Sequence, residues 1–456
     1  MSFLGRSARI AAFLLLGLVT LAVAWLAVMP PELLRVGTGY AAKMVCSNVF
    51  LVGRDSQDVL EVDVQAPGHP LLRLVSVDVD DERGWVAARM AGVFAGNAAF
   101  HRPGLGCAVA PEGEVDPAAQ EGVELAPINA QDVSAAWPDG ERVETPDPRL
   151  ADILTDPDLL GPGMRAVVVV KNGRIVGEAY GDGFDADSRL LGWSMTKSVT
   201  AAIMGRMVAD GLMTLDASGL FAEWSGDERA EISLANLLAM ESGLDFDESY
   251  GSVTDVTRML YLEPTASSFA LSRPLKEEPG KAFNYSSGET VILSRYWMSL
   301  FPSLEQAQRY PHDALFKPLG MGSAILEADT AGVFVGSSYM YATARDWARI
   351  GAFLANDGVW NGERLLPDGF VDLMRAPNGT SNGAYSKMQT WFLPPGQREL
   401  DASGLPEDVF WMRGHDGQSI AISSAEDLVV VRLGLTPVRQ GYSPAELVSA
   451  VRSALQ

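Results

Sequence analysis

A serine and a lysine three residues apart form the pair in this chain whose types and spacing could carry out covalent chemistry. They are Ser194 and Lys197, in the stretch Ser-Met-Thr-Lys that opens an apolar-patterned segment. In a helix, side chains three positions apart lie one turn apart on the same face, so the hydroxyl and the amine can meet. Of the seven lysines in the chain, only Lys197 has a serine three positions before it. The pair suits acyl transfer, in which the serine attacks a carbonyl and the amine accepts its proton.

The segment after Ser194 is predicted to be a helix that ends at Gly211. Apolar residues recur along one face of this helix, at Val199, Ala202, Ile203 and Met207. Free N–H groups in the first turn and the positive end of the helix can stabilise an oxyanion beside Ser194. Packing among apolar groups disfavours the ammonium form of Lys197 and favours the neutral amine that a base requires. The simpler alternative is an N-cap serine followed by a surface lysine, and the spacing alone does not exclude it.

A tyrosine ahead of a second predicted helix could work with this pair. Tyr285 lies in the stretch Pro279–Glu289, which runs from a turn into a helix. A phenol at this point can relay a proton between the serine, the lysine and the leaving group. Ser286 and Glu289 have capping-box spacing, which explains Ser286 without a functional role. Ser287 is left open between a helix cap and a contact with substrate.

A glycine-rich turn that enters a late strand is the third element. It reads Arg-Gly-His-Asp-Gly-Gln-Ser from Arg413 to Ser419. The glycines allow a ligand to approach the backbone closely, and the edge of the strand could supply an N–H group to an oxyanion hole. Taken alone, the segment is better explained as an ordinary hairpin with a solvated histidine.

The three segments together resemble the serine β-lactamase and penicillin-recognising hydrolase superfamily. That superfamily combines Ser-x-x-Lys with a Tyr-x-Asn or Ser-x-Asn element and a strand carrying Lys-Thr-Gly or a variant. The tyrosine form points to the class C β-lactamase-like branch, with its family VIII esterases and 6-aminohexanoate-dimer hydrolases. Further landmarks fall in the order of that branch, at Leu237–Leu244, Pro318–Met321 and Thr343–Gly351. The resemblance covers residues 150–456, and Gly192–Thr200 is most similar to the 6-aminohexanoate-dimer hydrolase group.

The resemblance implies a role for each of these segments. Ser194 would become acylated and Lys197 would take its proton. Tyr285 would pass a proton to the leaving group and later help to activate the deacylating water. The main-chain N–H groups of Ser194 and Gln418 would form the oxyanion hole. The implied reaction is a two-step acyl transfer that needs no metal and no cofactor.

Two departures from the family pattern bear on the substrate. Ser287 stands where β-lactamases keep an asparagine that holds the amide of the antibiotic side chain. His415, with Asp416 and Gly417, stands where they keep Lys-Thr-Gly, whose cation helps to hold a substrate carboxylate, and an imidazole carries less positive charge near neutral pH. Tyr250 is a loose match to a second pocket tyrosine of the 6-aminohexanoate-dimer hydrolases, and a packed loop tyrosine is the alternative.

These patterns predict a serine hydrolase whose partners are small-molecule esters or short amides. One rival is a β-lactamase or D,D-carboxypeptidase that acts on cell-wall-related substrates. The other is a catalytically silent binding or sensor protein that keeps the fold. The residues predicted to contact substrate are His415, Gly417, Ser287 and Tyr250.

The order of elements predicts an α+β fold of the β-lactamase and transpeptidase type. Strands are expected at Met164–Val170 and Ile175–Tyr180, and again at 409–413, 419–423 and 428–433. Terminal strands would then meet in one antiparallel sheet, flanked by helices and a mostly helical subdomain. The predicted domains are an anchor or signal segment at 1–35, an accessory module with a linker at 36–149, and the hydrolase domain at 150–456.

The N-terminus has the pattern of a membrane anchor. An uncharged run from Ile10 to Pro30 follows Arg6 and Arg9. About 20 apolar residues can cross a bilayer as a helix, and the basic flank leaves the rest of the chain outside. The pattern predicts a single-pass protein of the inner (cytoplasmic) membrane, with the membrane as a partner and a periplasmic or extracellular catalytic domain. A cleaved signal peptide is the alternative, supported weakly by the small residues at 22–24.

The remaining composition limits cysteine chemistry, partners and metals. Cys46 and Cys107 are a candidate disulfide outside the cytoplasm, and two separate thiols are the alternative. The net charge of −23 argues against nucleic acid as a partner, because nucleic acid requires a basic surface. His69, His101 and His312 lack metal-ligand spacing, so we expect no metal site.

Overall fold

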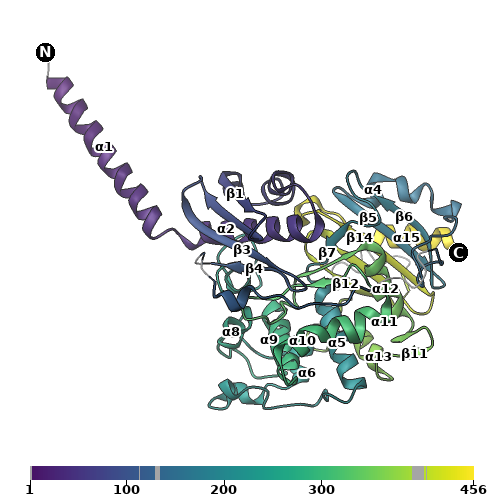
Figure 1. The fold of residues 1–456 in the computed structure, drawn as a ribbon. Coiled ribbons are helices and arrows are strands. Elements are labelled where there is room, and N and C mark those ends of the chain that lie inside the picture. Colours follow the sequence, from purple (N-terminus) through teal and green to yellow (C-terminus); the bar gives the residue numbers. More distant parts are fainter. Residues whose placement is uncertain (1–2, 112, 114, 129–133, 393–404, 407) are drawn as a thin grey trace. The chain divides into compact units, whose positions relative to one another are not determined.

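The computed structural model describes residues 3–456 except positions 112, 114, 129–133, 393–404 and 407. The chain divides into two compact units, neither of which is one continuous stretch (Figure 1). The first unit comprises Met1–His101, Ala108–Asp116 and Ser249–Pro264. The second comprises Arg102–Cys107, Pro117–Glu248 and Thr265–Gln456. The division of the sequence at residues 36 and 150 stays a prediction.

The N-terminal part of the chain consists of helices followed by a small sheet. Its two long helices are α1 (Phe3–Val28) and α2 (Glu32–Ser47). The sheet is antiparallel, with its four strands in chain order: β1 (Val75–Asp80), β2 (Trp85–Met90), β3 (Phe94–Arg102) and β4 (Gly106–Ala110). A turn at residues 81–84 connects β1 with β2, and α2 packs against both strands.

The prediction of an N-terminal membrane anchor is wrong. The N-terminal segment does form a helix, the 26-residue α1. Within the described part of the chain, however, no helix combines the length and the apolar character needed to cross a membrane. The correction extends to the membrane as a partner and to the predicted inner-membrane location.

An antiparallel sheet of five strands brings together segments from both ends of the second unit, as predicted. The strand order is β12-β13-β14-β5-β6. The strands are β5 (Met164–Lys171), β6 (Arg174–Tyr180), β12 (Phe410–Arg413), β13 (Ser419–Ser423) and β14 (Leu428–Gly434). Asn172 and Gly173 form the turn between β5 and β6, with φ values of 52° and 68°. These are the left-handed values that a two-residue hairpin requires.

The central strands are apolar throughout because helices cover both faces of the sheet. On one face, Val167, Val169 and Val430 join a buried cluster with residues of α15 (Pro444–Leu455). On the other face lies α12 (Ala344–Ala355), where a Cβ on Gly351 would stand 2.5 Å from a methyl group of Val429. A strand buried on both faces has no polar alternation, which is why this segment reads as a continuous run of valines.

Helix α5 (Met195–Ala209) begins directly after Ser194 and lies inside the second unit. The sequence predicts one apolar face, but 12 of the 15 residues are buried. Polar side chains at 196, 198 and 200 are therefore enclosed as well as the predicted apolar ones. The other helices of this unit include α6 (Leu234–Leu238), α8 (Ala266–Leu271), α9 (Ser287–Ser299), α10 (Leu304–Pro311) and α13 (Phe370–Arg375).

A smaller antiparallel sheet leads into α5. Its strands are β7 (Arg189–Leu191), β9 (Met340–Thr343) and β8 (Ile325–Leu326), in that order across the sheet. Antiparallel sheets combined with helices give the α+β class that the sequence predicts. Cys46 and Cys107 are both disulfide-bonded, so the alternative of two separate thiols is wrong.

Candidate active site

Ser194 lies in a tight turn between β7 and α5. The N–H group of Gly192 donates to the carbonyl of Met340 over 3.0 Å, and a Cβ at this glycine would collide with the ring of Trp347. Trp193 follows with φ of 48°, a left-handed conformation that strains a residue with a side chain. Ser194 occupies the N-cap position of α5, yet its hydroxyl makes no cap hydrogen bond. The hydroxyl is thus available to another partner.

That partner is the amine of Lys197. The side chain of Lys197 is 1% exposed, which excludes the alternative of a surface lysine. Its Nζ atom lies 3.2 Å from Ser194 Oγ, 3.0 Å from Ser287 Oγ and 3.1 Å from the carbonyl oxygen of Ser337. It also lies 4.8 Å from the ring centroid of Tyr285. The structure therefore brings together the residues that the sequence suggests as nucleophile, base and tyrosine.

The start of α9 separates the roles of two adjacent serines. Ser286 is the N-cap residue, and its hydroxyl accepts the N–H of Glu289 over 3.2 Å. The return half of the predicted capping box is not the contact that Glu289 makes: its carboxyl group accepts the hydroxyl of Ser242 over 2.8 Å instead. Burial raises the pKa of Glu289 well above its usual range. Ser287 is not a cap, because its hydroxyl faces Lys197.

Tyr285 presents its ring, rather than its hydroxyl, to Lys197. The ring lies 4.9 Å from that of Trp391 and 5.7 Å from that of Tyr385, measured between centroids. These aromatic contacts fix the plane of the tyrosine. Within the described residues, the Tyr285 hydroxyl has no hydrogen-bond partner. A bound substrate could supply one.

A carboxylate that the sequence analysis did not consider completes this cluster. Glu248 accepts the N–H of Ser287 on Oε2 over 2.7 Å and the hydroxyl of Ser287 on Oε1 over 2.5 Å. Glu248 belongs to a loop shortly after the landmark segment Leu237–Leu244. No spacing rule connects a loop residue to a serine 39 positions later, so only the three-dimensional structure reveals this contact.

The glycine-rich turn approaches the Ser194 turn through its main chain. Gly414 lies at the end of β12, and its N–H donates to the carbonyl of Gln418 over 2.8 Å. A Cβ at Gly414 would stand 2.2 Å from the carbonyl oxygen of Gly192. Asp416 and Gly417 follow with φ of 56° and 83°, so two successive left-handed residues redirect the chain into β13.

This arrangement leaves two N–H groups without internal partners. Within the described residues, no acceptor faces the main-chain N–H of Ser194 or of Gln418. The side chain of Gln418 is bound on both sides, since its Oε1 accepts the N–H of Gly434 over 2.9 Å and its Nε2 donates to the carbonyl of Asp416 over 3.3 Å. The buried guanidinium of Arg432 stabilises the turn by donating to the carbonyl of Gly417 over 3.2 Å. Burial lowers the pKa of this arginine.

Two further residues predicted to contact the substrate are His415 and Tyr250. The side chain of His415 is 39% exposed, its Nε2 lies 3.4 Å from Asp416 Oδ1, and its ring meets the edge of Trp193 at 5.8 Å. It therefore borders the Ser194 turn. Tyr250 belongs to the first unit, whereas Ser194 belongs to the second. The role of Tyr250 as a pocket tyrosine stays a prediction.

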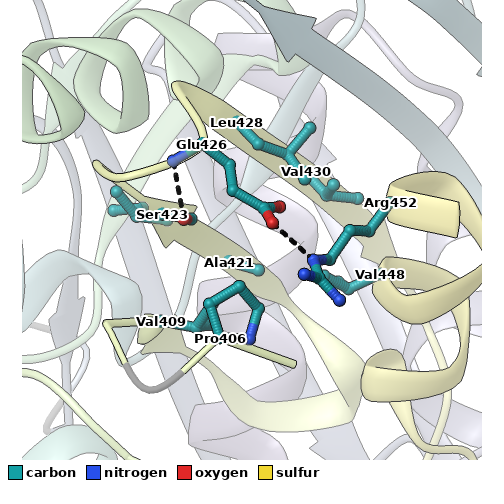
Figure 2. Close-up of a pocket in the computed structure, with 10 residues that line it drawn as sticks. Pro406, Val409, Ala421, Ser423, Glu426, Leu428, Val430, Val448 and Arg452 are labelled. Atoms are coloured by element: carbon teal, nitrogen blue, oxygen red, sulfur yellow. Dashed lines mark hydrogen bonds and ion pairs between the residues drawn. The ribbon is translucent and has the colours of Figure 1, made fainter. Parts of the chain in front are cut away.

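A small cavity lies at the opposite end of β13 from Gln418 (Figure 2). Its lining includes Val409, Leu428 and Val448, and an ion pair between Glu426 and Arg452 at 2.6 Å crosses it. The room inside is about 10 Å³, which is enough for one water molecule. None of the predicted catalytic or substrate-binding residues lines it, so we do not assign it to the active site.

The three histidines that lack metal-ligand spacing have local partners. His69 accepts the N–H of Leu71 over 3.2 Å, and His312 lies 2.7 Å from a carboxyl oxygen of Asp313. His101 stacks on Phe50 with 5.5 Å between ring centroids. In the part of the chain that the structure describes, no group of three or more histidine, cysteine, aspartate or glutamate residues could hold a metal ion.

The chain is similar to known proteins in sequence and in fold. The sequence profile of the family described as Beta-lactamase matches residues 158–439. A curated relative, the 6-aminohexanoate-dimer hydrolase of Paenarthrobacter ureafaciens, is 23% identical over 286 residues, which cover 60% of this chain and 72% of the relative.

Two solved structures share the fold. The "Putative 6-aminohexanoate-dimer hydrolase from Bacillus anthracis" superposes with a TM-score of 0.56 at 20% identity, covering 73% of this chain and 89% of the other. A family VIII carboxylesterase superposes with a TM-score of 0.51 at 15% identity, covering 68% of this chain and 99% of the other.

Proposed function

Since the chain belongs to the beta-lactamase family, we propose that it is a serine hydrolase that cleaves carboxylic esters or short amides through a covalent acyl-enzyme on Ser194. The observation that supports this most directly is the contact of 3.2 Å between Lys197 Nζ and Ser194 Oγ. A nucleophile within hydrogen-bond reach of a base, with the base held by further groups, is the arrangement that covalent catalysis requires.

Acylation begins with transfer of the Ser194 hydroxyl proton to the neutral amine of Lys197. The serine oxygen then forms a bond to the substrate carbonyl carbon, and the electron pair of the carbonyl moves onto its oxygen. Collapse of this tetrahedral intermediate breaks the bond to the leaving alcohol or amine. The oxyanion is stabilised by the main-chain N–H groups of Ser194 and Gln418, which have no internal acceptor within the described residues.

Tyr285 delivers the proton that the leaving group requires. Its ring is packed against Trp391, and its hydroxyl has no partner among the described residues, so it is held in place and available to substrate. Lys197, over the face of the same ring at 4.8 Å, supplies a positive charge once it has taken the serine proton. In the second step the same groups activate the water that releases the acyl group.

The substrate class follows from the groups beside the nucleophile. Ser287, in the place of the amide-binding asparagine, is occupied by Lys197 and Glu248 rather than turned outward. His415 lies 3.4 Å from the carboxylate of Asp416, which reduces the positive charge it can offer to a substrate carboxylate. Both features favour esters and short amides over penicillin-like substrates. The curated relative that hydrolyses 6-aminohexanoate dimers, as its name states, makes linear amides the first amides to assay.

The proposal is tested by assaying an ester, amide and β-lactam panel with wild type and Ser194→Ala. The substitution should abolish turnover of every accepted substrate and labelling by a fluorophosphonate probe, because it removes the attacking oxygen. Lys197→Ala should slow acylation by at least about 10³-fold, in line with the loss of a member of a catalytic unit. Circular dichroism checks that each variant keeps its fold.

Ser299→Ala is the matched control, because its exposed hydroxyl bonds only to the carbonyl of Tyr296 near the end of α9. It should behave as wild type. Undiminished turnover in Ser194→Ala would refute the mechanism. Nitrocefin turnover as the best activity would favour the β-lactamase alternative, and a wild-type protein that neither labels nor turns over any substrate would favour a silent binding protein.

A further inference from the structure

The environment of the Lys197 nitrogen determines which way its lone pair points. A neutral amine has two hydrogens to donate and one lone pair that can accept a proton. Three groups surround it: the hydroxyl of Ser194, the hydroxyl of Ser287 and the carbonyl of Ser337. The carbonyl can only accept, so it takes one amine hydrogen. The remaining question is which of the two hydroxyls receives the second hydrogen and which faces the lone pair.

Glu248 fixes the direction of these hydrogen bonds by binding the hydroxyl of Ser287. An ionised carboxylate only accepts hydrogen bonds, and Glu248 accepts both the N–H and the hydroxyl of Ser287, over 2.7 and 2.5 Å. The single hydroxyl hydrogen of Ser287 is therefore committed to Glu248. Its oxygen is left with lone pairs only, and it must accept the second hydrogen of Lys197.

We propose that Glu248 is a positioning residue that, acting through Ser287, directs the lone pair of Lys197 onto the hydroxyl of Ser194. The inference rests on the proposed serine hydrolase mechanism. With both amine hydrogens bound to Ser287 and Ser337, the one proton that can reach the amine comes from Ser194. After the transfer, the new ammonium ion has three hydrogens for three acceptors, and no bond has to rearrange before the serine oxygen attacks.

The hydrogen bonds that join Glu248, Ser287 and Lys197 form a relay, and protonation of Glu248 reverses their direction. A carboxylic acid can donate to Ser287, whose hydroxyl is then free to donate to the lone pair of Lys197 and so to block the base. The titratable groups around this relay are Lys197 on α5, Tyr285 and Glu289 at the start of α9, and Tyr385, whose buried phenol interacts electrostatically with Glu248, Glu289 and Tyr285. Loss of activity at low pH should therefore include a proton uptake that the Glu248→Gln variant lacks.

The test uses Glu248→Gln in the full chain. The variant replaces one of the two acceptor oxygens of Glu248 by an NH2 group, which only donates, so the N–H and the hydroxyl of Ser287 can no longer each be accepted by its own side-chain oxygen. We expect the second-order rate of fluorophosphonate labelling at Ser194 to fall about 10- to 100-fold, the size of effect known for loss of a group that orients a functional side chain. Glu248→Asp keeps an ionised acceptor and should recover part of the rate. The matched control is Asp245→Asn, which removes an exposed carboxylate three positions earlier in the same loop.

The pH profile separates a positioning role from a structural one. At low pH the Glu248→Gln rate should fall with one proton fewer than the wild-type rate, because the variant has no carboxyl group at this position. Ser287→Ala removes the relay, so adding Glu248→Gln to it should cause no further loss.

The possible failures can be told apart. Wild type that does not label at Ser194 overturns the proposed function. Wild type that labels, together with a Glu248→Gln variant of unchanged rate and pH profile, overturns only the role of Glu248. Additive losses in the double variant also overturn it, because two residues of one relay cannot act independently.

Discussion

Asp329 is a buried residue whose charge is coupled to folding. It is 6% exposed, and its oxygens accept N–H groups of Ala331, Val333 and Ala266. Burial opposes these hydrogen bonds and outweighs them, raising the pKa of Asp329 to about 6 from 3.8. The folded state therefore binds a proton at this residue more tightly than the unfolded state does.

The sign of the resulting pH dependence follows from linkage. The folded state is stabilised because it binds the proton of Asp329 more tightly than the unfolded state does. This stabilisation is complete below about pH 4 and is lost as the pH rises through 6. The shift of about two pKa units corresponds to about 3 kcal/mol. This stabilisation is measured by urea unfolding of wild type and Asp329→Asn between pH 4 and 7. The unfolding free energy of the wild type minus that of the variant should fall as the pH rises. A difference that stays constant over this range would contradict the assignment.

At the same scale, some site residues could be predicted from the sequence and others could not. Ser194 and Lys197 follow from helical geometry, because a separation of three residues places side chains on one face. Ser287 could be located but not interpreted, since its contacts come from two other segments. Glu248 had no sequence signal at all, because its loop meets α9 only through the tertiary fold.

At the scale of elements, the hairpin of β12 and β13 and the Ser194 turn meet through glycine. Gly414→Ala would place a methyl group 2.2 Å from the carbonyl oxygen of Gly192, so one of the two segments must move. We expect a fall in kcat of about 10- to 100-fold, because a displacement of about 1 Å in a catalytic geometry has an effect of this size. Gly226→Ala is the control, since a Cβ there meets nothing within 4 Å. Equal kcat values for the two variants would contradict this account of the hairpin.

The elements also show which sequence patterns are reliable. The strands of the five-stranded sheet match their predictions within a residue or two at the ends, because apolar runs between turn residues are local signals. Helix α5 was predicted to have one buried face, and it is enclosed on nearly every side. Its small and hydroxyl side chains, such as Thr200, find buried partners like the carbonyl of Gly336, and composition does not reveal such partners.

At the scale of the whole molecule, the disulfide of Cys46 and Cys107 closes a loop of about 60 residues. In the chain-entropy model, such a loop contributes about 4 kcal/mol by restricting the unfolded chain. Reductant should lower the urea midpoint of the wild type. A variant with both cysteines replaced by serine should unfold at that lower midpoint even when no reductant is present. If reductant lowers the midpoint of that variant too, the effect does not come from the disulfide.

The main-chain origin of the two unpaired N–H groups has a consequence for how the protein can change. Ser194 and Gln418 offer their backbone amides, and the turns that present them are set by φ values and glycine contacts rather than by pocket side chains. In the proposed mechanism, substitutions around the substrate can then alter which acyl group is accepted while the geometry that stabilises the oxyanion stays the same. Selectivity and catalytic power would thereby be separable traits, and a duplicated copy of this chain could acquire a new substrate without rebuilding its chemistry.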